Sequence, residues 1–279
     1  MPRLFVSSVA LMGAALLCSS SSLAHEAKTV EVTTRSAKPK GENIFKGADM
    51  YVNPYFQEEL DSSIKTASGE VKKTLQSIRG LSSAYWLDVK SKAPHVRGFA
   101  LNTANYQTVG EMCPFWDYCL GGKNVNATCC DDPCKLAQQY NAGNNEMNYA
   151  LLLHNKTTTL WPSFEPRFVI DTGRNGQADM RDSCSNWCNI RGAGIGHRPT
   201  VKTGSPLVDA FLWLKTPGES DGCTQILPGA EKEQCPRFDS MCMSVDSIGS
   251  LESDPRAPEA GLWFDYQIKE LAANARLDG

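Results

Sequence analysis

The chain has 279 residues, of which 41% are hydrophobic and 21% are charged, and its formal net charge is −3. A chain of this length can bury the core of one large domain. A mildly acidic chain with no basic stripe is unsuited to a phosphate backbone, so we expect no nucleic-acid partner.

The first 24 residues have the pattern of a secretory signal peptide. A basic start at Arg3 is followed by an apolar run and then by small residues. The run is shorter than the ~20 apolar residues that span a bilayer. We therefore expect residues 1–24 to be removed and the mature chain to be secreted and extracellular, with no membrane contact. Residues 25–46 are polar and mixed in charge, which predicts a flexible leader. The folded domain is then expected at 47–279.

Cysteine usage points to the same compartment. The chain has 11 cysteines, and Cys18 falls in the predicted signal peptide, which leaves an even set of ten. In an exported chain such a set predicts disulfides, whose pairing the sequence leaves open. Five of the ten fall in a cysteine-rich insert at 111–141, which we expect to be a disulfide-linked segment outside the core. Sequons at Asn126 and Asn155 fit glycosylation during export.

Periodicity along the rest of the chain predicts alternating helices and strands. Apolar residues recur at helical spacing from Asn53 to Gly80, where the glycine ends the helix. Short apolar runs that end in polar residues predict parallel strands and an α/β fold, with the polar ends where a barrel binds ligands. The strands are expected at Ala84–Val89, Arg97–Asn102, Arg167–Asp171 and Pro206–Lys215, and further helices at Glu146–His154 and Ala260–Ala275.

Five motifs follow one another in a specific order. They are Trp-Leu-Asp at 86–88, Ala-Asn-Tyr at 104–106, Asp-Thr-Gly-Arg at 171–174, Trp-Cys-Asn at 187–189 and Lys-Thr-Pro-Gly-Glu-Ser-Asp-Gly at 215–222. Together they resemble glycoside hydrolase family 6, the cellulases that cut β-1,4-glucan. The resemblance implies a distorted, incomplete parallel β/α barrel of the family 6 cellulase type. It also implies a cellulose-like substrate and an inverting reaction in which water attacks the sugar directly.

The resemblance implies a base-side carboxylate. Asp221 matches the family's candidate base, while Lys215 and Glu219 match neighbours that bind the sugar. A nearby lysine favours an ionised carboxylate, and a nearby acid opposes it. Judged without the resemblance, the same residues would be interpreted as a solvated acidic loop.

The resemblance also implies a sugar platform. Trp86 and Trp187 match stacking positions, where an indole offers apolar area to a pyranose ring. The alternative is that both are core tryptophans. An implied disulfide between Cys188 and Cys242 would stiffen the loop that carries Trp187. Other residues expected near the cleft, because they follow strand ends, are Asp88, Asn105 and Arg174.

One segment of the family pattern is missing. Eight residues separate Asp88 from Arg97, where the family has several βα units, one of which carries the aspartate general acid. A single crossover needs at least ~10–12 residues, so those units are absent from this chain. Three interpretations stay open. The chain is a hydrolase with a substitute acid such as Asp88, or a non-catalytic carbohydrate-binding relative, or the product of an incomplete gene model whose true product retains the missing segment.

The sequence predicts no metal or cofactor. The glycines at 192, 194 and 196 lack the dinucleotide-binding spacing. The acidic stretch 171–182 imitates a calcium loop without its terminal glutamate. The four histidines show no ligand spacing. We expect a monomer whose partner is a β-glucan.

Overall fold

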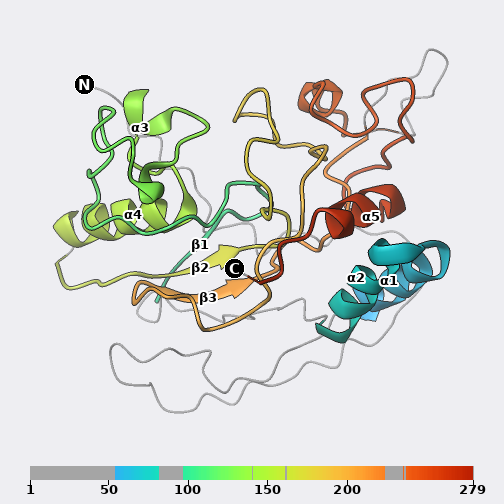
Figure 1. Ribbon diagram of the computed structural model, residues 1–279, viewed down its shortest axis with the longest axis horizontal. Helices are drawn as coiled ribbons and strands as arrows, with labels where there is room; N and C mark the ends of the chain where they lie inside the picture. Colours follow the sequence, from blue (N-terminus) through green and yellow to red (C-terminus); the bar gives the residue numbers. More distant parts are fainter. Residues whose placement is uncertain are drawn as a thin grey trace. The chain divides into compact units, whose positions relative to one another are not determined.

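Three short parallel strands form the centre of the computed structural model (Figure 1). The structure describes residues 54–81, 97–139, 141–160, 162–223, 235 and 237–278. The strands are β1 (Gly98–Leu101), β2 (Arg167–Asp171) and β3 (Val208–Leu212), in the spatial order β1-β2-β3. A parallel sheet flanked by helices confirms the predicted α/β class. The predicted signal peptide, the leader and the strand at Ala84–Val89 lie outside the described residues.

Two of the three strands, β2 and β3, carry most of the buried residues of the sheet. Every residue of β3 is buried, as are Phe168 and Ile170 of β2, and such continuous burial is typical of parallel sheets. β3 is shorter than the predicted Pro206–Lys215. After Leu212 the backbone N–H groups of Leu214 and Lys215 donate to the Asp171 carboxylate instead of a neighbouring strand.

The predicted helix from Asn53 to Gly80 is two helices, α1 (Pro54–Thr66) and α2 (Gly69–Leu81). Gly69, the first residue of α2, has a φ of +60°, a left-handed conformation that interrupts the helical path between the two helices and that glycine adopts at little cost. The prediction of one helix was wrong because the apolar spacing continues across this break. Side chains from both helices share one core with α5: Leu60, Leu75, Ile78, Ile268 and Leu271.

The helix predicted at Ala260–Ala275 is the shorter α5 (Asp265–Ala273). Residues before it are occupied elsewhere, because the N–H groups of Gly261 and Phe264 donate to the carbonyls of Ser220 and Gly218. The C-terminal segment is therefore attached to the loop that carries Asp221. Figure 1 shows α5 beside α1 and α2.

Helix α4 (Glu146–Leu160) is longer than predicted and joins the sheet to the cysteine-rich segment, residues 111–141. Met147 and Ala150 pack with the buried side chains of the sheet. At the helix start, the amides of Asn144 and Asn148 donate to the Cys129 carbonyl at 2.9 and 2.7 Å. These buried amides satisfy a carbonyl that the segment could not pair internally.

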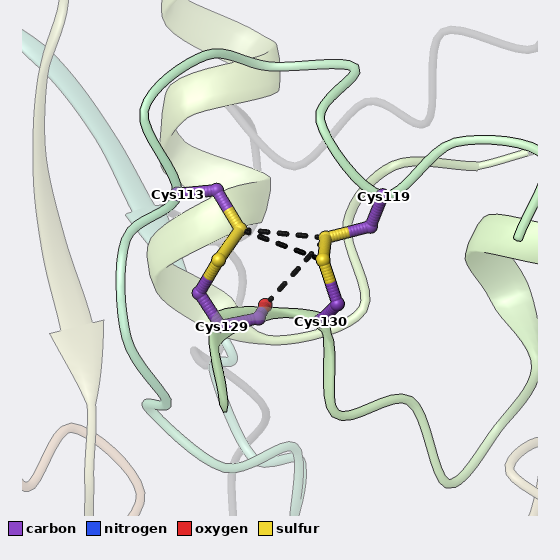
Figure 2. A group of neighbouring side chains, drawn as sticks. All are labelled: Cys113, Cys119, Cys129 and Cys130. Atoms are coloured by element: carbon purple, nitrogen blue, oxygen red, sulfur yellow. Dashed lines mark hydrogen bonds between the residues drawn. A yellow bond between two sulfur atoms is a disulfide. The ribbon is translucent and has the colours of Figure 1, made fainter. Parts of the chain in front are cut away.

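The cysteine-rich segment is cross-linked as predicted, and it also contains the short helices η3 (Thr128–Cys130) and α3 (Leu136–Gln139). Figure 2 shows two disulfides side by side, with the sulfurs of Cys113 and Cys119 3.3 Å apart. All ten cysteines beyond the predicted signal peptide are paired, as Cys113–Cys129, Cys119–Cys130, Cys134–Cys184, Cys188–Cys242 and Cys223–Cys235.

Among the described residues, no helix has both the length and the apolar character needed to cross a membrane.

Candidate functional site

Asp221 lies at the centre of a buried polar network. Its Oδ2 accepts hydrogen bonds from Arg174 Nη1 at 2.6 Å, the Tyr106 hydroxyl at 2.9 Å and the Asn189 N–H at 2.9 Å. The side chains of Arg174 and Asp221 are only 1% and 5% exposed. Three donors on one oxygen fix the orientation of this carboxylate and leave Oδ1 as its less occupied atom.

Arg174 faces Asp221 rather than an open surface. Its Nη2 donates to the Ala104 carbonyl at 2.6 Å, and its guanidinium lies 4.4 Å from the centre of the Tyr106 ring. Burial alone would lower the pKa of Arg174, but Asp221, Tyr106 and Asp171 together outweigh it and the pKa rises. For the Tyr106 phenol, burial acts in the other direction and raises the pKa. The hydroxyl therefore keeps its proton and donates a hydrogen bond to Asp221. These contacts show Arg174 holding Asp221, while the sugar contact expected from the sequence stays a prediction.

Asn189 locks the Asp221 loop in place. Its side-chain Oδ1 accepts the Asp221 N–H at 2.8 Å, while its own N–H donates to the Asp221 carboxylate. Its Nδ2 donates to the Gly222 carbonyl at 2.8 Å. Asn189 has a φ of +44°, a conformation that non-glycine residues seldom adopt and that tertiary contacts must maintain.

Lys215 and Glu219 lie beside the same carboxylate. Lys215 Nζ is 3.3 Å from Glu219 Oε2 and 4.0 Å from Asp221 Oδ1. The two side chains are partly exposed, at 17% and 23%, so this edge of the network is the part nearest solvent. Lys215 therefore faces the oxygen of Asp221 that Arg174 and Tyr106 do not hold.

Trp187 is partly exposed and lies on the loop that contacts Asp221, two residues before Asn189. The structure joins the adjacent Cys188 to Cys242, the pair that the family resemblance implied. Gly222 packs on this disulfide, where an added Cβ would lie 2.9 Å from the Cys242 sulfur. The loops of Trp187 and Asp221 thus converge on one covalently fixed place.

The remaining candidates differ in placement. Asn105 is exposed, and its Oδ1 accepts hydrogen bonds from Arg181 Nη1 at 3.1 Å and from the Tyr106 N–H at 2.8 Å. Trp86 and Asp88 lie outside the described residues, so their expected roles stay predictions.

Asp171, at the end of β2, has a structural role. Four backbone N–H groups donate to its carboxylate, from Ala104, Gly173, Leu214 and Lys215, at 2.9–3.2 Å. Burial raises its pKa, while those donors act in the opposite direction. The carboxylate ties together the chain segments that follow the three strands.

The chain also matches a protein-family model. The model for "Glycosyl hydrolases family 6" matches residues 90–275. The chain belongs to glycoside hydrolase family 6. The resemblance inferred from the motifs is thereby confirmed.

Curated relatives of this family 6 chain are fungal. Exoglucanase 3 of Agaricus bisporus is 34% identical over 181 residues, which cover 65% of this chain and 33% of that protein. The 1,4-beta-D-glucan cellobiohydrolase C of Emericella nidulans is 32% identical over 202 residues, or 72% of this chain and 36% of that protein. The chain thus spans about a third of the length of these relatives.

A solved structure supports the family fold. A mutant of the CcCel6A catalytic domain matches with a TM-score of 0.64 at 18% identity and covers 86% of this chain and 100% of that one. At this identity the match concerns the fold alone. It confirms the predicted family 6 type of α/β architecture, which the described strands represent in part.

Sequence reasoning missed two site residues of this family 6 chain, Tyr106 and Asn189. Both stand inside motifs that carried the resemblance, at the ends of Ala-Asn-Tyr and Trp-Cys-Asn. Their side chains hold Asp221. The signal was present, but no pattern in the sequence indicates which distant carboxylate a buried tyrosine will reach.

The two sequons lie in different environments. Asn126 is exposed in a turn, and the Thr128 hydroxyl of its sequon donates to Glu111 at 2.6 Å. Asn155 is half-buried within α4, and its carbonyl accepts hydrogen bonds from Thr158 and Thr159. Glycosylation stays a prediction, with Asn126 the more accessible acceptor.

Four cysteine sulfurs lie within 4.8 Å of one another, those of Cys113, Cys119, Cys129 and Cys130. Each is bonded to a partner in a disulfide (Figure 2), so none is a free thiolate that could ligate a metal.

Proposed function

We propose that this chain acts on β-1,4-glucan as an inverting hydrolase of family 6, with Asp221 as the base. The observation that carries the proposal is the convergence of Trp187, Lys215 and the Arg174–Asp221 pair on one loop cluster. Family membership and the names of the relatives, an exoglucanase and a cellobiohydrolase, support the same substrate class.

The proposed chemistry follows from the asymmetry of the Asp221 carboxylate. Its Oδ2 is held by three donors, so Oδ1, beside Lys215, is the atom that would take a proton from water. The water oxygen would bond to the anomeric carbon as the glycosidic C–O bond breaks. Attack from the face opposite the leaving group inverts the configuration.

The leaving oxygen requires a proton from an acid on the other side of the sugar. The family's acid lies in the segment that the eight residues between Asp88 and Arg97 replace. We propose Asp88 for this role, since it lies near the C-terminal end of a predicted strand. The Trp86 and Trp187 indoles would bind the glucan by stacking, and Asn105, Lys215 and Glu219 would bind its hydroxyls.

A second function, non-catalytic glucan binding, is favoured by a specific observation. The Asp221 carboxylate is only 5% exposed, and both its oxygens have cationic neighbours. A chain that keeps this network without the family's acid segment could retain the platform and lose hydrolysis, because a general acid contributes about 10²–10⁴-fold to the rate.

Two assays separate these functions. Purified protein should release sugar from soluble β-glucan, and Asp221→Asn should reduce the rate by about 10²–10⁴-fold. A retained rate in that variant would reject Asp221 as the base. Binding to insoluble cellulose that is lost in Trp187→Ala, with no sugar released by the unmodified chain, would select the binding function. Circular dichroism of each variant controls for misfolding.

We also infer export of the chain. Five disulfides in the described structure support an oxidising compartment. Expression in a fungal host and N-terminal sequencing of the medium protein tests this inference, with a start near residue 25 expected.

A further inference from the structure

A small open cavity lies between the cysteine-rich segment and the loop 177–184. Its volume is about 80 Å³, several times what one water molecule needs. The residues that line it include Tyr106, Thr108, Pro133, Asp179, Arg181 and Ala193. It shares Tyr106 with the Asp221 network but none of the other residues that hold the carboxylate.

The walls of this cavity are fixed. The Cys134–Cys184 disulfide crosses from the cysteine-rich segment to the loop and lines the cavity with both cysteines. Arg181 donates to the carbonyls of Cys184 and Asn186 at 3.1 Å and to Gln107 Oε1 at 3.3 Å. A ligand would therefore meet walls that need little ordering, which reduces the entropic cost of binding.

Polar groups with spare hydrogen-bonding capacity line the cavity. Within the described part of the chain, the carboxylate of the exposed Asp179 and the hydroxyl of the half-buried Thr108 have no hydrogen-bond partner in the protein. Asp179 has a φ of +58°, which is uncommon for a residue other than glycine. Apolar surface from Met180 and Ala193 adjoins these groups. Gln107, Gln177 and Arg181 also line the cavity, so polar and apolar surface share the lining, which suits a small molecule that carries both kinds of group.

The cavity is connected to the candidate glucan site on two sides. The hydroxyl of Tyr106, which lines the cavity, donates to Asp221. Arg181 binds Asn105 Oδ1 and the carbonyl of Asn186, the residue before Trp187. The cavity wall is thus hydrogen-bonded to Asp221 and to the residue that precedes Trp187.

We propose that this cavity is an additional pyranose subsite, which takes the edge of one glucose unit of a β-1,4-glucan beyond the unit at Trp187. Asp179 accepts hydrogen bonds from sugar hydroxyls, and Thr108 donates one or accepts one. The apolar surface contacts the C–H groups of the ring. The proposal rests on the proposed glucan function and names a subsite that depends on the cysteine-rich segment.

The test compares a short and a long oligosaccharide by isothermal titration calorimetry on the full chain. Cellohexaose is expected to bind more tightly than cellotriose, because only the longer chain reaches both Trp187 and the cavity. Asp179→Ala and the isosteric Thr108→Val should each weaken cellohexaose binding about threefold to tenfold, the effect of one hydrogen bond. Both variants should leave cellotriose binding unchanged.

Asp182→Ala is the matched control, since Asp182 is an exposed acid of the same loop that does not line the cavity. It should bind both sugars as the unmodified chain does. If Asp179→Ala and Thr108→Val, both folded by circular dichroism, bind cellohexaose with unchanged affinity, the subsite is rejected and the glucan function stands. If the unmodified chain binds neither sugar, the proposed function itself fails, and the subsite fails with it.

Discussion

The Asp221 network and the cysteine-rich segment are held together in opposite ways. Around Asp221, buried charges and amides satisfy one another, and Arg174 is only 2% exposed. In the cysteine-rich segment a small cluster of two disulfides and Ala137 takes the place of a large apolar core. A polar network depends on every partner being present, whereas a disulfide constrains the chain whatever surrounds it. Substitutions in the Asp221 network should therefore change both stability and glucan binding. Substitutions in the cysteine-rich segment should be able to change one of these properties without the other.

The largest effect is expected from Arg174→Met. The substitution leaves the buried Asp221 carboxylate without its nearest ion-pair partner, with only Lys215 at 4.0 Å, which should cost about 3–5 kcal/mol of unfolding free energy. Urea denaturation measures the loss. Adding Asp221→Leu in the same chain should recover part of the stability, because the unpaired charge is then gone. A loss in the single variant no larger than ~1 kcal/mol would show that the network is not what holds this region.

Removing a disulfide from the cysteine-rich segment should cost stability alone. Cys113→Ala with Cys129→Ala opens a crosslink of sequence separation 16, worth about 3 kcal/mol in the chain-entropy model. Thermal unfolding should move to lower temperature, with cellotriose affinity unchanged. The matched variant is Cys188→Ala with Cys242→Ala, which also frees the Trp187 loop and should weaken cellotriose binding. If the two double variants lose cellotriose affinity equally, the two regions do not differ in their contribution to glucan binding.

Glu146 lies where the two regions meet, at the start of α4. Its Oε2 is buried with no hydrogen-bond partner among the described residues. Burial, with a smaller contribution from Asp171, raises the pKa of Glu146 to about 8.

A carboxyl whose pKa is higher in the folded chain than in the unfolded chain stabilises the fold most at low pH. Unfolded Glu146 ionises near pH ~4.3, so its contribution should fall as the pH rises from there to about 8. The slope is at most ~1.4 kcal/mol per pH unit. Glu146→Gln should abolish this component, and the difference between the two urea-denaturation profiles isolates it. Parallel profiles from pH 5 to 8 would contradict the raised pKa.

A smaller effect is expected from Tyr106→Phe. The hydroxyl donates to Asp221 and accepts the Ile190 N–H at 3.2 Å, so its loss should cost about 1–2 kcal/mol. The cost is lower than for Arg174→Met because Arg174 and Asn189 still hold the carboxylate. Lys73→Met, in the exposed pair with Glu70, provides the baseline and should change stability by less than about 0.5 kcal/mol. If Tyr106→Phe costs no more stability than Lys73→Met, the Tyr106 hydroxyl does not help to hold Asp221.

Local chemistry explains which elements the sequence predicted well. β2 was predicted with the observed bounds, because an apolar run that ends in an acid is a local signal. The break between α1 and α2 was missed, since it depends on the left-handed Gly69 within a continuous apolar pattern. The ends of β3 and α5 were misplaced because their flanking N–H groups bond to Asp171 and to the 218–220 loop, which are distant in sequence.

The amino-acid sequence by itself determined the family, the α/β class, the even set of cysteines and the motifs that contain the site. Those features depend on residue type and spacing, which can be seen in the sequence without knowledge of the fold. Only the tertiary structure decided the disulfide partners other than Cys188–Cys242, the burial of Arg174 under Asp221, and the cavity between Thr108 and Asp179. Each of these depends on bringing together side chains from separate parts of the chain, and burial then sets how strongly their charges and hydrogen bonds act.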